Sequence, residues 1–185
     1  MIIGICGKQG SGKTTLTNEL AKYFDNLVYL NVDSIAHDVI NNVDVQKKLI
    51  EAFGDNIVCD GVTNRRLLSK IVFSSDEKLE YLENITWEYM ERVIDKFLES
   101  HKDKIIIIDW ALLPRCKHFD LCDLKILLDI PYEIRKERIL KRDNITEGQV
   151  DARDKKSVNY NSADFDVILY NNDYESIRKL VKKND

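Results

Sequence analysis

The sequence contains few of the residues that interrupt regular structure. Only two prolines, Pro114 and Pro131, and seven glycines occur in 185 residues, and there is no repeat or low-complexity tract. Long helices and strands with short connections are therefore expected. Apolar residues make up 44% of the chain and charged residues 32%, which is the balance of a globular protein rather than a disordered one. At this length the sequence predicts one domain with one hydrophobic core.

Long apolar runs are also lacking. The longest purely aliphatic run, Ile105–Ile108, is far below the roughly 20 residues of a membrane-spanning helix. The N-terminus has no basic start followed by an apolar stretch, which would indicate a secretion signal. We therefore expect no membrane partner, no secretion and a cytoplasmic location.

Closely spaced cysteines and an excess of positive charge are absent as well. No C-x-x-C pair occurs, so neither a zinc knuckle nor a redox pair is expected, and reduced cytosolic thiols are the simpler interpretation. The formal net charge is −4 and the sequence pI is near 5.5, which gives no electrostatic reason to bind nucleic acid. The four cysteines are Cys6, Cys59, Cys116 and Cys122.

Short apolar runs and helical patterns alternate along the chain. The runs have the length of strands, and most are apolar on both faces, as in a buried parallel sheet. This alternation predicts an α/β fold, a parallel sheet with helices on both faces. The expected strands are 2–6, 27–30, 105–108, 124–128 and 167–169. The expected helices are 14–24, two or more within 65–100, 132–142, and 146 to about 156, the last with Thr146 and Gln149 as a capping box.

The stretch from Gly7 to Thr15 reads GKQGSGKTT and follows the first apolar run. It fits the phosphate-loop pattern G-x-x-x-x-G-K-[ST] between a strand and a helix, whereas a glycine-rich turn that binds nothing is the alternative. Such a loop turns backbone N–H groups toward phosphates. Lys13 is predicted to reach the β- and γ-phosphates and act in catalysis, and the Thr14 hydroxyl to bind Mg²⁺. The expected ATP contacts are Gly7, Gln9, Gly10, Ser11, Gly12, Lys13, Thr14 and Thr15.

Asp109 ends the aliphatic run 105–108. A strand that ends in a carboxylate is the usual second element of a phosphate site, so Asp109 is expected to help bind Mg²⁺ and substrate. An ordinary turn residue at the end of the strand is the alternative. The N-K-x-D and D-x-x-G motifs of GTPases do not occur, which disfavours a switch GTPase and favours a kinase.

A kinase also needs a carboxylate that removes the proton of the acceptor hydroxyl. Asp33 follows the second apolar run, and carboxyl ends of parallel strands converge on the ligand crevice. The alternative is a helix N-cap, since Asp33-Ser34-Ile35-Ala36-His37 has the appearance of a helix start. His37 is either a solvated surface histidine or a contact to the substrate.

Six segments together resemble the dephospho-coenzyme A kinase family: GKQGSGKTT, NVDSIAHDVI, GVTNRRLLSKIVFSSDEKLEYLENIT, IIIIDWALLP, RILKRDNITEGQVDAR and ADFDVILYNN. The resemblance implies a P-loop kinase that uses ATP and Mg²⁺ to phosphorylate the ribose 3′-hydroxyl of dephospho-coenzyme A. It implies that Asp33 is the general base, that Arg65 contacts the acceptor, and that Arg138 and Arg142 close over ATP, with Arg142 in catalysis. A solvated helix face, with Glu133 and Glu137 as pairing partners, is the alternative for the two lid arginines.

The sequence departs from the family pattern mainly on the acceptor side. The expected residues are replaced at Asn31, Thr86-Trp87, Trp110-Ala111 and Ser157. Either tryptophan could stack in an altered acceptor pocket or pack in the core. Three functions therefore stay open: this kinase, a related kinase with another nucleoside-like acceptor, and a nucleotide-binding protein without transfer. In each, one domain is expected, with a helical acceptor segment at about 60–100 and a mobile lid at about 132–160.

Overall fold

A computed structural model describes residues 1–155, 157–171 and 173–184, and it leaves the side chains of His37 and Asn184 undescribed. The chain divides into two compact units, Met1–Asn31 with Leu98–Asp185, and Val32–Phe97. The predicted acceptor segment begins and largely remains in the second unit, and the predicted lid lies in the first. That the two units form one domain stays a prediction.

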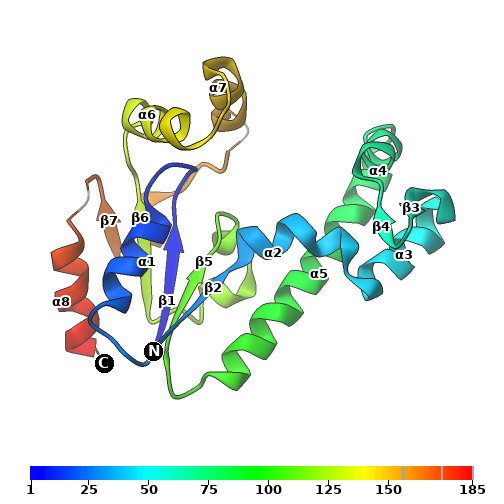
Figure 1. The fold of residues 1–185 in the computed structure, drawn as a ribbon. Helices are drawn as coiled ribbons and strands as arrows, with labels where there is room; N and C mark the ends of the chain where they lie inside the picture. The colour runs from blue at the N-terminus through cyan, green and yellow to red at the C-terminus, as the bar shows by residue number, and fades with distance from the viewer. Residues whose placement is uncertain (156, 172, 185) are drawn as a thin grey trace. The chain divides into compact units, whose positions relative to one another are not determined.

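The first unit is built on a five-stranded parallel sheet with the order β2-β5-β1-β6-β7 (Figure 1). All five predicted strands are confirmed, and the apolar character of the central ones follows from burial on both faces. Their bounds are β1 Ile2–Cys6, β2 Leu27–Asn31, β5 Ile105–Asp109, β6 Leu124–Leu128 and β7 Val167–Leu169.

Two helices cover one face of this sheet. Helix α1, Lys13–Ala21, and helix α8, Tyr174–Asn184, place Leu16, Leu20 and Ile177 in one core cluster with Ile3 and other strand residues. The helix in 132–142 is confirmed as α6, Tyr132–Arg142, and α7, Glu147–Lys155, follows it. The predicted capping box begins α7: the Gln149 N–H donates to Thr146 Oγ1 at 3.3 Å and the Thr146 N–H to Gln149 Oε1 at 2.9 Å.

On the opposite face of β1, Gly4 has no side chain, and neighbouring side chains fill the space that one would take. A Cβ at Gly4 would lie 2.9 Å from Cys122 Sγ and 3.0 Å from Leu113 Cδ2. Leu113 belongs to the short 3₁₀ turn Leu113–Arg115, and a second one, Lys117–Phe119, follows before β6. The chain therefore packs this irregular segment directly against the central strand.

The second unit is mainly helical. The stretch 65–100 holds two helices as predicted, whereas the helix at 43–53 and the small hairpin of β3 and β4 were not anticipated. The bounds are α2 Val32–Asp38, α3 Val43–Phe53, β3 Val58–Cys59, β4 Val62–Thr63, α4 Arg65–Val72 and α5 Asp76–Ser100, with 3₁₀ turns at Val39–Asn41 and Asp55–Ile57. No helix in the described ranges combines the length and hydropathy of a bilayer-spanning segment.

Candidate active site

The phosphate loop joins β1 to α1 and takes a conformation that its glycines permit. Gly7, Gly10 and Gly12 have φ angles of 151°, 78° and 99°. At Gly10 a side chain is excluded for a second reason, because its Cβ would lie 2.8 Å from the Arg135 carbonyl oxygen. The backbone of α6 therefore packs directly on the loop. Ser11 is buried, and its Oγ has no hydrogen-bond partner within the described residues.

Lys13 begins α1 and folds back along the loop. Its ammonium donates a hydrogen bond to the Gly7 carbonyl at 2.9 Å and lies 3.9 Å from Asp109 Oδ1. Thr14 and Thr15 follow in the first turn and are exposed. The positive end of the helix dipole and the Lys13 ammonium therefore lie at the same loop, which is suited to an anion.

Asp109 is the last residue of β5 and is only 2% exposed. The alternative of an ordinary turn residue is therefore wrong, since a buried carboxylate beside a lysine is held in place. Tyr29 donates its hydroxyl hydrogen to Asp109 Oδ2 at 2.8 Å, and the Asn31 amide donates to the Tyr29 oxygen at 3.0 Å. The sheet register brings Asn31 and Asp109 side by side at the carboxyl ends of β2 and β5.

Tyr29 was missed as a site residue by the sequence analysis. Burial and then the Asp109 carboxylate raise the pKa of Tyr29 above its ordinary value, while hydrogen bonds from Thr14 and Asn31 act in the opposite direction. The phenol is thus protonated and serves as a donor. The signal was the two-residue period of β2, which places Tyr29 and Asn31 on the same face.

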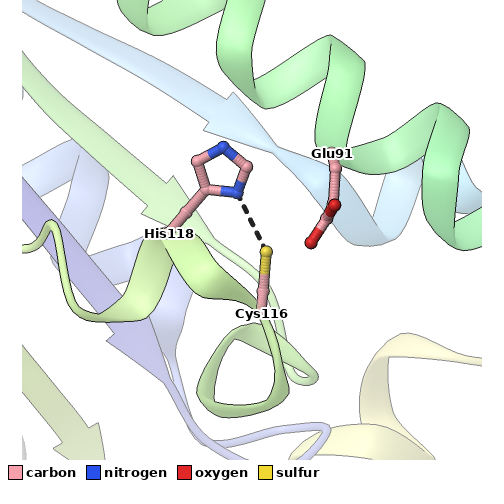
Figure 2. Close-up of side chains that lie close together, drawn as sticks. All are labelled: Glu91, Cys116 and His118. Atoms are coloured by element: carbon pink, nitrogen blue, oxygen red, sulfur yellow. Dashed lines mark hydrogen bonds between the residues drawn. The ribbon is translucent and has the colours of Figure 1, made fainter.

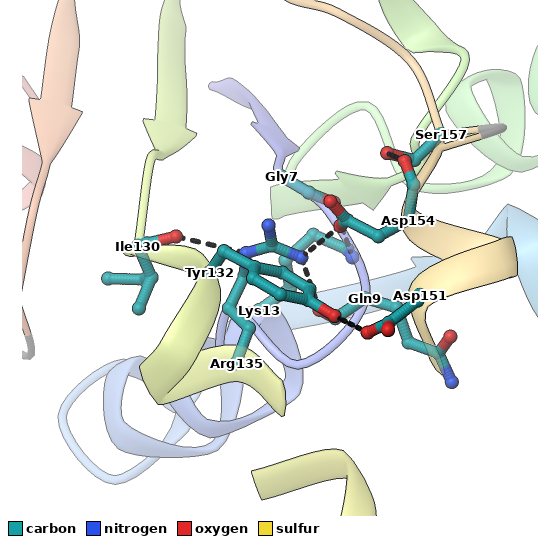
Figure 3. A network of polar contacts seen from close by, with 9 residues as sticks. All are labelled: Gly7, Gln9, Lys13, Ile130, Tyr132, Arg135, Asp151, Asp154 and Ser157. Carbon is teal, nitrogen blue, oxygen red and sulfur yellow. Dashed lines mark hydrogen bonds and ion pairs between the residues drawn. The ribbon is translucent and has the colours of Figure 1, made fainter. Parts of the chain in front are cut away.

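Arg135 of α6 ties three segments together, although only its neighbours Arg138 and Arg142 were predicted. Its guanidinium donates to the Ile130 carbonyl at 2.9 Å, to the Gln9 carbonyl at 3.3 Å and to Asp154 Oδ1 at 2.6 Å (Figure 3). The Arg135 side chain is 6% exposed and that of Asp154 23%. This buried ion pair links α6 to α7 and both to the phosphate loop.

Arg138 and Arg142 differ from each other in their surroundings. Arg138 donates to the loop carbonyls of Gly10 at 3.3 Å and Ser11 at 3.4 Å. Arg142 is 62% exposed on its side chain and forms a two-point pair with Asp143 at 2.7 and 3.0 Å, which raises the pKa of Arg142 and lowers that of Asp143. Gln9 also donates to Asp143, at 3.2 Å.

The alternative partners proposed for these arginines are not the ones observed. Glu137 pairs with Lys141 at 2.6 Å instead of with Arg138 or Arg142. Further contacts hold α6 to α7: Lys136 lies 2.8 Å from Glu147 and 3.5 Å from Asp151, and Tyr132 donates to Asp151. The predicted lid segment therefore contains a pair of helices joined by side-chain contacts.

The predicted acceptor residues of the second unit lie on helix ends. Asp33 is exposed in the first turn of α2, one residue inside the helix, so the N-cap alternative is wrong in position. Arg65 begins α4 and lies 3.4 Å from Asp38 Oδ1. His37 lies in α2, but its side chain falls outside the described residues.

A buried thiol and imidazole form a pair that the cysteine spacing did not reveal. Cys116 Sγ and His118 Nδ1 are 2.9 Å apart in the irregular segment before β6, and both side chains are buried (Figure 2). Glu91, also drawn there, belongs to the second unit.

Cys122, a further buried cysteine before β6, has a perturbed thiol. Burial raises the pKa of the Cys122 thiol to about 12, so this thiol is protonated at neutral pH.

Comparisons with known proteins agree with this geometry. A profile of the dephospho-CoA kinase family matches residues 1–175. The chain belongs to the dephospho-CoA kinase family. Curated dephospho-CoA kinases similar to it include that of Aquifex aeolicus, 31% identical over 98% of this chain and 94% of the relative. Another, from Prochlorococcus marinus subsp. pastoris, is 30% identical over 98% and 93% of the two chains.

Solved structures support the same fold. TT1252 from Thermus thermophilus has a TM-score of 0.79 at 25% identity and covers 100% of this chain and 97% of its own. A shikimate kinase from Acinetobacter baumannii, with a TM-score of 0.54 at 15% identity over 100% and 94% of the two chains, resembles it in fold alone. The chain thus has the P-loop fold, as predicted, and its family makes it a kinase.

The departures from the dephospho-CoA kinase pattern have structural partners in this chain. Asn31 contacts Tyr29 as described, and Ser157 donates its hydroxyl hydrogen to the Asp154 carbonyl at 2.6 Å. Trp110 is 2% exposed, which confirms core packing. Trp87 is half-buried and donates from Nε1 to Glu91 at 3.3 Å.

Proposed function

We propose that this kinase transfers the γ-phosphoryl group of ATP to the ribose 3′-hydroxyl of dephospho-coenzyme A. The observation that carries the proposal is the position of Lys13, whose ammonium lies between the Gly7 carbonyl and the Asp109 carboxylate. Membership of the dephospho-CoA kinase family supports the choice of acceptor. The phosphate loop would bind the triphosphate through its backbone N–H groups, with Lys13 at the β- and γ-phosphates.

Magnesium fits the donor groups at this end of the sheet. The Thr14 hydroxyl is exposed, and the Asp109 carboxylate is held by Tyr29 and faces Lys13. Hydroxyl and carboxylate oxygens are the hard ligands that Mg²⁺ prefers. When bound, the ion would neutralise part of the phosphate charge. Thr14 and Asp109 are the residues that would hold it, directly or through its water shell.

The lid arginines would supply positive charge where phosphoryl transfer spreads negative charge. Arg138 already contacts the loop backbone, so a small change of its rotamer would bring its guanidinium to a bound phosphate. The exposed guanidinium of Arg142 pairs with the half-buried carboxylate of Asp143, which an anionic phosphate can replace because both bind the guanidinium in the same two-point geometry. Both residues would therefore bind ATP and stabilise the transition state.

Asp33 would accept the proton of the ribose hydroxyl. It follows two residues after Asn31, which ends β2 at the carboxyl edge of the sheet. Arg65, whose guanidinium is half exposed beside Asp38, would bind the anionic part of the acceptor.

The deciding experiment measures γ-phosphoryl transfer from Mg-ATP to dephospho-coenzyme A, with the product identified by mass and hydrolysis measured without acceptor. Acceptor-dependent formation of coenzyme A is expected. A different nucleoside-like acceptor is the second candidate, and the amide of Asn31 in place of the family's carboxylate favours it. Phosphorylation of such an acceptor but not of dephospho-coenzyme A would select this candidate. ATP binding with no transfer to any hydroxyl acceptor would contradict both.

A further inference from the structure

A chain of three side chains ends on the buried carboxylate of the phosphate site. The Asn31 amide donates to the Tyr29 oxygen at 3.0 Å, and the Tyr29 hydroxyl donates to Asp109 Oδ2 at 2.8 Å. Tyr29 therefore contacts Asp109, one of the two residues predicted from the sequence to bind Mg²⁺, and neither the sequence pattern nor the family resemblance assigns Tyr29 a role.

The direction of these hydrogen bonds is fixed by chemistry. Asp109 is an acceptor when ionised, and the amide nitrogen of Asn31 is a donor, so the single hydroxyl hydrogen of Tyr29 must go to Asp109. One carboxylate oxygen, Oδ2, is engaged by the phenol, while the other, Oδ1, lies 3.9 Å from Lys13 Nζ. A partial rotation of the carboxylate plane would break the contact with Tyr29, so the phenol fixes the orientation in which a carboxylate oxygen faces Lys13.

We propose that Tyr29 is a positioning residue of the magnesium-binding end of the site: its hydroxyl orients the carboxylate of Asp109, one of the two predicted oxygen ligands. This inference rests on the proposed binding of Mg-ATP. It differs from a purely structural role, in which the phenol only satisfies a buried carboxylate. A structural role would lower stability when the hydroxyl is removed but would leave the effect of Mg²⁺ on nucleotide binding unchanged.

The test is calorimetric binding of ADP to the full chain, with Mg²⁺ and with EDTA, in Tyr29→Phe and in the unaltered protein. The measured quantity is the ratio of the two dissociation constants, which reports on Mg²⁺ independently of turnover. Tyr29→Phe keeps the ring and removes only the oxygen. The ratio is expected to fall about tenfold, as is usual when a partner that orients a metal ligand is removed, while the affinity in EDTA changes by less than about twofold.

A matched control and a double mutant separate positioning from general damage. Tyr23→Phe removes the hydroxyl of a tyrosine that is 56% exposed, with Arg178 over its ring, and should leave the ratio unchanged. In an Asp109→Asn background, Tyr29→Phe should change the ratio by less than about twofold, because the phenol acts through the carboxylate. An additional full loss in that background would overturn the proposal.

The proposal is also overturned if Tyr29→Phe keeps the ratio of the unaltered protein, or if Mg²⁺ does not tighten binding in the unaltered protein at all. Should Tyr29→Phe fail to fold, Asn31→Ala removes the donor on the other side of the phenol. A loss of about twofold to threefold in the ratio is then expected, and an unchanged ratio would contradict the proposal. Absence of transfer to dephospho-coenzyme A, with Mg²⁺-dependent binding intact, would instead count against the proposed acceptor alone.

Discussion

The two compact units hold their predicted site residues in different ways. In the first unit Lys13, Asp109 and Arg135 are mostly buried, and hydrogen bonds and an ion pair hold them against neighbouring segments. In the second unit Asp33 and Arg65 are exposed on the first turns of helices. A side chain that is already held in place binds a ligand without a further loss of conformational entropy. An exposed side chain loses conformational entropy when the substrate orders it, which weakens its net contribution to binding. The first unit should therefore control ATP affinity, and the second the acceptor and turnover.

Lys13→Ala should have the largest effect. It removes the ammonium between Gly7 and Asp109, so kcat/KM for ATP should fall about 10³-fold and ATP affinity should fall with it. Transfer assays and calorimetry with ATP measure both quantities. Lys22→Ala is the matched control, because Lys22 is an exposed lysine near the other end of α1 that pairs with Glu19. Unchanged ATP affinity in Lys13→Ala would contradict the comparison of the two units.

Asp33→Asn should lower kcat by about 10² or more while ATP affinity stays nearly unchanged, because only proton removal is lost. Single-turnover assays and nucleotide titrations distinguish the two effects. Asp44→Asn alters another exposed acid in the first turn of a helix of the same unit, and it should retain activity. If Asp33→Asn were as active as the unaltered protein, Asp33 would have only a structural role in the first turn of α2.

Arg135→Met should destabilise the first unit by about 2 kcal/mol, since it breaks a buried ion pair and leaves Asp154 without its partner. The midpoint of urea unfolding measures this change. Arg142→Met, from the same helix but with a side chain that is 62% exposed, should change the free energy of unfolding by less than about 0.5 kcal/mol. Equal effects of the two substitutions would show that burial of Arg135 is not the cause.

Arg65→Ala should raise KM for the acceptor about tenfold and leave KM for ATP unchanged, as expected for loss of a charge-assisted hydrogen bond at a half-exposed site. Steady-state kinetics with each substrate varied in turn measure this. Arg66→Ala changes the next exposed arginine and provides the control. An equal rise in both KM values would place Arg65 outside the acceptor site.

The sheet and the phosphate loop could be predicted from the sequence because local patterns determine them. The aliphatic runs that became β1 and β5 are apolar on both faces, and the glycines and Lys13 occupy fixed positions in a loop pattern. The capping box of α7 was likewise readable, since Thr146 and Gln149 lie three residues apart. These features depend on residues that are near one another in the chain.

Contacts between distant residues could not be predicted in the same way. Arg135 meets Gln9 across 126 positions and Tyr29 meets Asp109 across 80. No local pattern records which arginine of α6 turns inward, since Arg135, Arg138 and Arg142 all recur at helical spacing. Helix α3 of the second unit was missed because it lies in a short stretch with no long apolar period. Asp33 and Arg65 stay predictions, since their roles depend on the bound acceptor.

The absence of a side chain at Gly4 lets the Cys122 thiol pack against the central strand, and this packing bears on how the thiol responds to oxidation. Cys122 Sγ and Leu113 Cδ2 together occupy the space beside the central strand where a side chain at Gly4 would lie. An oxygen or alkyl group added to this sulfur would have no room and would push on the strand that carries the phosphate loop. Burial and the raised pKa keep the Cys122 thiol unreactive, so oxidation of the protein in air should begin at the exposed Cys59 and leave the strand behind the phosphate loop undisturbed.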